Sequence, residues 1–115
     1  MKYRTYIAIG IILILGISMM GMQVGATAPR YIGLKYSSGT LSATILHFSP
    51  FPKLHYIYKV DIEKNGLAYL SEEYTSQPRF LIYTYTYNVN ATTGDILRVT
   101  ATCDLFGKLT RSITV

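Results

Sequence analysis

Apolar and polar residues alternate with a period of two along most of the sequence after residue 30. The clearest example is residues 97–105, where Leu97, Val99, Ala101, Cys103 and Leu105 are separated by single polar residues. Because successive side chains of a β-strand point to opposite faces, this stretch predicts a strand with one face in a core. No stretch of ten or more residues in this part has the 3.6-residue repeat of an amphipathic helix. The pattern therefore predicts an all-β domain.

Turn-forming residues divide this part of the chain into seven predicted strands. The strands are residues 31–36, 41–45, 54–63, 67–74, 81–90, 97–105 and 109–115. Asn65-Gly66, a dipeptide typical of tight hairpin turns, separates the third strand from the fourth. In the third strand the alternation places Leu54 on the core face and His55 on the polar face. Seven short strands at this spacing predict an antiparallel two-layer β-sandwich.

The number and spacing of these strands resembles the immunoglobulin-like superfamily. Cys103 lies on the sixth strand, where antibody-type domains carry one Cys of their disulfide. The second strand has no Cys, the chain has no Trp, and Ala101 replaces the Tyr that precedes that Cys in antibody-type domains. The resemblance therefore implies a small immunoglobulin-like sandwich over residues 29–115, but not an antibody-type domain.

The first 28 residues follow a different pattern. Lys2 and Arg4 precede an uncharged apolar run, residues 7–22, and small residues follow at Ala26 and Ala28. This is the pattern of a secretory signal peptide, and the run is shorter than the ~20 residues of a spanning helix, which favours cleavage. The alternative is an uncleaved anchor, in which residues 6–28 are the chain's contact with the membrane. Both alternatives predict that residues 29–115 are secreted or displayed at the cell surface.

Composition limits the possible classes of function. The chain has 115 residues, a net charge of +5 and a single Cys. One Cys excludes both an intrachain disulfide and a zinc site built from several thiolates. Lys2 and Arg4 supply two of the positive charges, and export argues against nucleic acid as a partner.

Two histidines and the cysteine are the candidates for chemistry. His47 and His55, together with Asp61 or Glu63, could form a metal site of two imidazoles and a carboxylate, but no HxH or HExxH spacing supports it. Cys103 with a His is the minimal set for thiol catalysis, yet it shares the core face of its strand, where a thiol packs as a small apolar group. The sequence therefore predicts no metal, no other cofactor and no enzyme.

Tyrosines form stripes on two of the predicted strands. They are Tyr83, Tyr85 and Tyr87 on the fifth strand, and Tyr56 and Tyr58 on the third. Stacking within the core is the favoured interpretation, and an exposed contact surface is the alternative. Asn90-Ala91-Thr92 matches the acceptor sequence for N-linked glycans, so Asn90 is predicted to carry a glycan in a host that glycosylates exported proteins.

An exported domain with no recognisable site resembles fimbrial and pilus subunits, which assemble by strand addition. That resemblance implies a non-enzymatic filament or coat subunit, whose partners are copies of itself or another cell-surface protein. It also implies that a segment after the signal is donated to a neighbouring subunit, here Tyr31, Ile32, Leu34 and Tyr36. The alternatives are a membrane-anchored binding or accessory domain and a small secreted hydrolase, which would need His47 and His55.

Overall fold

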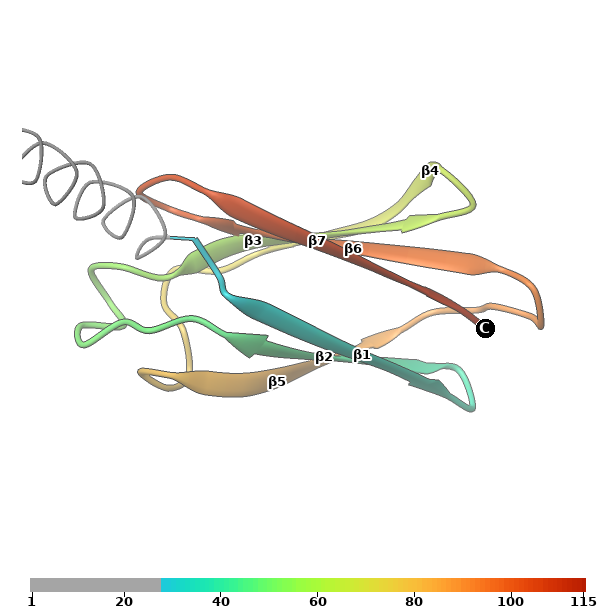
Figure 1. Ribbon diagram of the computed structural model, residues 1–115, viewed down its shortest axis with the longest axis horizontal. Helices are drawn as coiled ribbons and strands as arrows, with labels where there is room; N and C mark the ends of the chain where they lie inside the picture. The colour runs from blue at the N-terminus through green and yellow to red at the C-terminus, as the bar shows by residue number, and fades with distance from the viewer. Residues whose placement is uncertain (1–27) are drawn as a thin grey trace, which may run out of the picture.

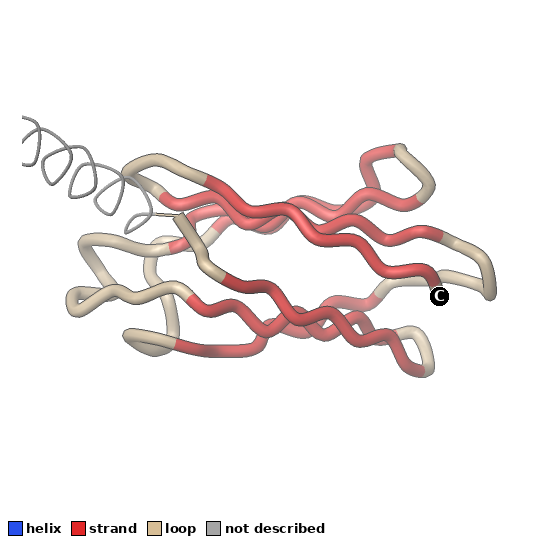
Figure 2. The backbone as a smooth tube through the Cα atoms, in the orientation of Figure 1, coloured by secondary structure: helices blue, strands red, loops and turns tan. Residues whose placement is uncertain are grey.

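Residues 28–115 are described by the computed structural model and form two antiparallel β-sheets packed face to face (Figures 1 and 2). The strands are β1 (Tyr31–Ser37), β2 (Thr40–Leu46), β3 (Ile57–Lys64), β4 (Leu67–Glu73), β5 (Ile82–Asn88), β6 (Ile96–Cys103) and β7 (Lys108–Thr114). One sheet has the order β1-β2-β5 and the other β4-β3-β6-β7. The predicted all-β class and the seven antiparallel strands are therefore confirmed. The predicted signal or anchor segment lies outside the described residues, except for Ala28.

The described residues contain no helix, so none of their segments is a helix long and apolar enough to cross a membrane. The core lies between the two sheets and takes alternate side chains from both. Leu41, Ala43 and Ile45 on β2 face Leu97, Val99 and Ala101 on β6, and all six are fully buried. Burial of each Leu, Ile or Val side chain contributes roughly 1.5–3 kcal/mol.

The first strand completes a sheet of its own chain. β1 pairs with β2 along its whole length, from Tyr31 opposite Leu46 to Ser37 opposite Thr40. Ile32 is buried in the core, and the Tyr36 hydroxyl donates a hydrogen bond to the Val89 carbonyl at 2.7 Å. β1 is the edge strand of its sheet and pairs with β2 on one side only, so the donor-strand role of Tyr31, Ile32, Leu34 and Tyr36 stays a prediction.

The third strand begins later than predicted, and its alternation is shifted. The pairing of β3 with β6 slips between Ile57 and Lys59, which makes Tyr58 the extra residue of a β-bulge. Because a bulge adds one residue to the strand, the side chains before it point to the face opposite to the one that simple alternation predicts. Ile57 is therefore fully buried while Leu54 is exposed, the reverse of the prediction. His55, two residues before Ile57, accordingly lies on the inward side.

The tyrosine stripes are mostly internal. Tyr83 and Tyr87 are buried, and Tyr85 is half-buried with its ring stacked on that of Tyr74 at a centroid distance of 4.3 Å. Tyr74 and Tyr87 also share a hydrogen bond of 2.8 Å between their hydroxyls. The core interpretation therefore holds for Tyr83 and Tyr87, which are not available as a contact surface. Tyr56 and Tyr58 are half-buried.

The two ends of the sandwich differ (Figure 1). At one end three loops gather, residues 47–56, 74–81 and 104–107, beside the start of the described chain at residue 28. At the other end lie two tight turns with positive φ, Ser38-Gly39 and Asn65-Gly66, and the loop of residues 89–95. We call these the loop end and the turn end. Leu105, predicted in the core, follows the end of β6 and is exposed at the loop end.

Candidate metal centre

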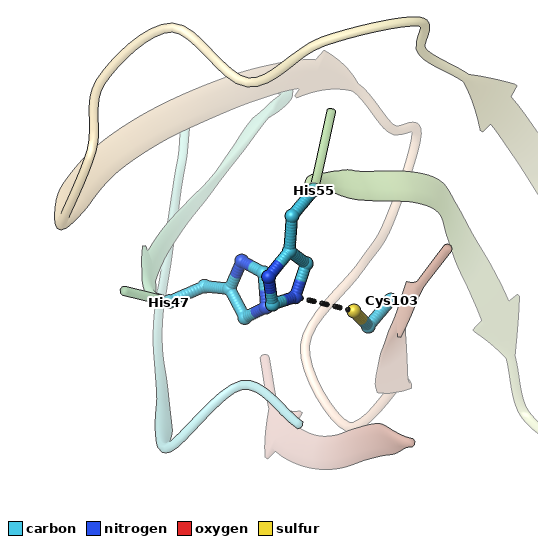
Figure 3. A group of neighbouring side chains, drawn as sticks. All are labelled: His47, His55 and Cys103. Carbon is cyan, nitrogen blue, oxygen red and sulfur yellow. Dashed lines mark hydrogen bonds between the residues drawn. The ribbon is translucent and has the colours of Figure 1, made fainter. Parts of the chain in front are cut away.

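Three side chains with metal-binding atoms converge at the loop end (Figure 3). His47 directly follows β2, His55 lies just before β3, and Cys103 is the last residue of β6. One ring nitrogen from each His and the Cys103 sulfur all lie within 4.8 Å of one another. His47 and Cys103 are buried and His55 is half-buried. The fold therefore brings His47, from the end of one sheet, together with His55 and Cys103, which both belong to the ends of strands in the other sheet.

His47 is held by a buried amide. The Nε2 group of Gln77 donates hydrogen bonds to the carbonyls of His47 and Arg79, both at 2.9 Å. This orientation directs the oxygen of Gln77 at the imidazole, where the distance between Oε1 and Nδ1 is 2.7 Å. This contact favours the tautomer in which Nδ1 donates to Gln77. Fixing one ring nitrogen by a hydrogen bond is how proteins orient histidine ligands of metals.

His55 is positioned by the loop that contains it. The backbone N–H groups of Leu54 and His55 both donate to the Phe51 carbonyl, which closes a tight turn. The Ser49 hydroxyl donates to the His55 carbonyl. The two imidazole rings meet edge to face, with centroids 4.8 Å apart. These contacts place Nε2 of His55 3.0 Å from the sulfur of Cys103.

Cys103 lies in a turn that directs backbone N–H groups at its sulfur. Burial is the largest influence on the thiol and raises its pKa above the usual value. Hydrogen bonds to the sulfur from the backbone of Leu105 and Phe106 act in the opposite direction and favour the thiolate. Without a metal the thiol thus keeps its proton near neutral pH. A metal ion would displace that proton, and the two N–H groups would then stabilise the bound thiolate.

The combination of two imidazoles and a thiolate selects a class of metal. These donors suit Zn, Fe and Cu, whereas Mg and Ca prefer oxygen ligands. Ligand atoms of one tetrahedral ion lie roughly 3.3–3.6 Å apart for the usual Zn–N and Zn–S lengths. The three atoms here already lie within 4.8 Å, so small side-chain rotations bring all of them onto one ion. The residues present therefore fit a metal.

The same three residues are poorly suited to nucleophilic catalysis. The contact between His55 and Cys103 has the distance of a thiol–imidazole pair. The exposed fraction of Cys103 is only 2%, and its pKa is raised, so the thiolate is disfavoured and a substrate cannot approach the sulfur. Packing of Cys103 in the core was predicted correctly, but its role as a candidate ligand was missed.

The structure does not bring the predicted carboxylates to the histidines. Asp61 lies further along β3, where it contacts Lys59 at 3.5 Å and accepts a hydrogen bond from Ser71. Glu63 is two residues further from the site, opposite Ala68 and Arg98. The prediction that His55 shares their polar face is wrong, because the bulge at Tyr58 reverses its direction. Gln77 was also missed, since a single Gln in a loop carries no sequence signal.

No protein-family model and no curated protein sequence matches this chain. Among solved structures, the fold is similar to two variant forms of superoxide reductase (neelaredoxin) from Ignicoccus hospitalis. One has a TM-score of 0.49 and 15% sequence identity, over 82% of this chain and 85% of that chain. The other has a TM-score of 0.46 and 11% identity, over 76% of this chain and 81% of that chain. These likenesses are too weak to assign an activity.

The interpretation as a filament subunit is corrected by the side-chain cluster at the loop end. Within residues 28–115, His47, His55 and Cys103 form a cluster suited to a metal, which a non-enzymatic structural or adhesive subunit does not require. The predictions of a fimbrial relationship and of no enzymatic role are therefore wrong. Sequence reasoning failed because it grouped His47 and His55 with Asp61 or Glu63 and assigned Cys103 to the core.

Proposed function

We propose that His47, His55 and Cys103 bind one transition-metal ion and that this protein is a small metalloprotein with an enzymatic, redox role. The observation that carries the proposal is the convergence of the three ligand atoms within 4.8 Å of one another. The description of the sandwich as immunoglobulin-like is part of the same proposal and rests on the strand orders β1-β2-β5 and β4-β3-β6-β7.

Supporting contacts around the ligands favour a metal over a plain polar cluster. The carbonyl oxygen of Gln77 is held in position by the two hydrogen bonds of its own Nε2 group. It therefore favours one tautomer of His47, while backbone N–H groups point at the sulfur of Cys103. Removing a residue that forms a hydrogen bond to a metal ligand usually lowers the metal affinity by 10–100-fold.

The donor set also indicates what a bound ion can do. The described residues supply three ligands, which leaves at least one coordination position for an outside molecule, as in catalytic metal sites. A thiolate with imidazoles supports one-electron chemistry when the ion is Fe or Cu. The half-buried His55 is the ligand nearest to solvent, so an outside reactant would approach from its side. Superoxide is the first reactant to assay, because the similar structures are named for it.

Metal titration of single variants tests the proposal. The native chain is expected to bind one Fe(II), Cu(I) or Zn(II) ion under anaerobic conditions, and Cys103→Ser or His55→Ala is expected to weaken the binding by about a hundredfold or more. Plasma emission spectrometry after gel filtration gives the stoichiometry, and competition with a chromophoric chelator gives the affinity.

Asp61→Asn is the matched control, because Asp61 is the carboxylate that the sequence suggested and the structure excludes. This variant is expected to bind metal as the native chain does. Loss of binding in Asp61→Asn with retention in Cys103→Ser would contradict the proposed ligand set. Circular dichroism verifies that each variant keeps its β-sheet content.

Export of residues 29–115 and glycosylation of Asn90 remain proposals that are based on the sequence. Asn90 is exposed at the turn end, at the opposite end of the sandwich from the metal centre. A glycan there would therefore leave the approach to His55 open.

A further inference from the structure

Large apolar side chains are concentrated at the loop end. Six are more than half exposed there, with exposed fractions from 57% to 75%; they are Phe48, Phe51, Leu54, Phe80, Leu105 and Phe106. Within residues 28–115 only one other large apolar side chain is as exposed, Leu67 at the turn end. Such a concentration on one side of a small domain marks an interaction surface.

The three loops that carry these side chains are joined to one another. The N–H of Ser49 donates to the Phe80 carbonyl at 2.6 Å, and the N–H of Asp104 donates to the Tyr56 carbonyl at 3.0 Å. Residues 50–54 and 76–78 line an open, mainly apolar hollow of about 610 Å³. The six side chains therefore belong to one surface, which we call the apolar tip.

The loop end also carries positive charge. Arg30, Lys53 and Arg79 are exposed around the apolar tip. Asp104, within these loops, is half-buried and accepts a hydrogen bond from the Tyr56 backbone, and Glu73 is exposed at the end of β4, next to residues 74–81. Aromatic and aliphatic side chains surrounded by Arg and Lys are typical of surfaces that bind at the interface of an anionic bilayer.

The sequence places a second apolar segment within reach of the tip. The described chain begins at Ala28, which lies against Gly107 in the loop that carries Phe106. The uncharged apolar run, residues 7–22, ends six residues before Ala28. Six residues span at most about 20 Å when fully extended. A bilayer that holds this run would therefore lie next to the apolar tip.

We propose that the apolar tip rests on the surface of a phospholipid bilayer, with its aromatic side chains at the boundary between headgroups and acyl chains. The surrounding cations contact anionic headgroups, and the turn end points away from the membrane. This inference does not depend on metal binding, although it places the candidate metal centre beside the headgroup layer.

The absence of Trp from the chain allows a direct test. Phe51→Trp introduces a single Trp at the apolar tip, which can be excited at wavelengths where the 11 Tyr do not absorb, and Leu67→Trp introduces a matched one at the turn end. The full 115-residue chain is reconstituted into phosphatidylcholine–phosphatidylglycerol vesicles with or without bromine atoms near the headgroup end of the acyl chains. Bromine quenches Trp only at close range. We expect the Phe51→Trp variant to lose about half of its emission in the brominated vesicles and the Leu67→Trp variant to lose almost none.

Several outcomes would overturn the proposal. Equal quenching of both variants means that the domain has no preferred orientation on the bilayer. An unquenched Phe51→Trp variant with blue-shifted emission means that a second copy, or another part of the chain, covers the tip. An unquenched and solvent-exposed Trp means that the tip faces water. Phe80→Trp serves as a second reporter if Phe51→Trp misfolds, and replacing Leu54 and Phe106 by Ser should weaken the quenching of either reporter.

Discussion

The strands are joined in different ways at the two ends of the sandwich. At the turn end the hydrogen bonds that join strands are exposed to water. Asn65 and Gly66 adopt positive φ, and Asp95 accepts hydrogen bonds from the Thr92 backbone and the Asn65 side chain, both at 2.9 Å. These bonds, with the Thr92 backbone as the main cause, lower the pKa of Asp95. At the loop end the joins are buried, and the Gln77 side chain connects its own loop, residues 74–81, to His47 and to the start of β3 at Ile57.

This difference explains why the chemistry lies at one end. In short turns the polar groups are exposed to water and make few contacts with one another. Such turns therefore do not hold side chains in the fixed positions that a ligand site needs. Long loops bury polar groups such as His47, Ser49 and Gln77, which must find partners inside the protein. Those partners hold the imidazoles in fixed directions. The cluster with Cys103 is thus a product of how the loop end is closed.

The difference between the two ends is tested most strongly by removing, at each end, one amide side chain that forms hydrogen bonds to other segments. Gln77→Ala is expected to destabilise the domain by about 3 kcal/mol, because buried groups of His47, Arg79 and Ile57 lose their hydrogen-bond partner. It should also weaken metal binding by about 10–100-fold. Urea unfolding and metal titration measure the two effects.

Asn65→Gly is the matched variant at the turn end. It removes the contacts of the Asn65 side chain with Asp95 and with the Ile96 N–H, and Gly keeps the positive φ without strain. Because these bonds are exposed, we expect a loss of about 1 kcal/mol or less and unchanged metal affinity. Equal destabilisation by the two variants would contradict the proposed difference between the ends.

Alkaline pH should weaken the core that both ends share. Burial is the main cause that raises the pKa of Tyr85 to about 12, and it raises the pKa values of Tyr83 and Tyr87 further. The unfolded chain ionises near the usual value of 10.0. The stability from these buried phenols is therefore fully present below pH 10 and is lost as the pH rises toward the folded values.

We expect the melting temperature to fall by about 10 °C between pH 9 and pH 11, which calorimetry can measure. Tyr85→Phe, which removes one ionising group, should reduce this fall. A melting temperature that is constant up to pH 11 would mean that the tyrosines are solvated.

The smallest expected effect concerns a single turn. Gly66 has a φ of +81°, and a Cβ there would meet no atom within 4 Å. Gly66→Ala therefore introduces only backbone strain, about 1 kcal/mol. Urea unfolding should show this loss with metal binding unchanged. Altered metal affinity in this variant would mean that the two ends are coupled through the sheets.

Much of the fold could be predicted from the sequence because its signals are local. Alternation of side chains identified β6, and Asn65-Gly66 identified the hairpin between β3 and β4. The bulge at Tyr58 was not predictable, because it depends on how β3 meets Cys103 and Thr102 of another strand. Without the bulge, His55 was assigned to the wrong face.

The candidate site was less accessible to sequence reasoning than the fold. His55 and Cys103 are 48 residues apart, and the spacing resembles no compact metal motif. Both histidines were recognised, but the third ligand was sought among Asp61 and Glu63, which share the segment of His55. The true neighbour comes from the strand that pairs with β3. Only the sheet register could have indicated it.

X-ray absorption spectroscopy of the iron- or copper-loaded native chain tests the central claim most directly. The account predicts one sulfur scatterer at about 2.3 Å and two imidazole nitrogens at roughly 2.0–2.1 Å, with the sulfur lost in Cys103→Ser. A first shell of only oxygen and nitrogen in the native chain, or a spectrum unchanged by Cys103→Ser, would contradict it.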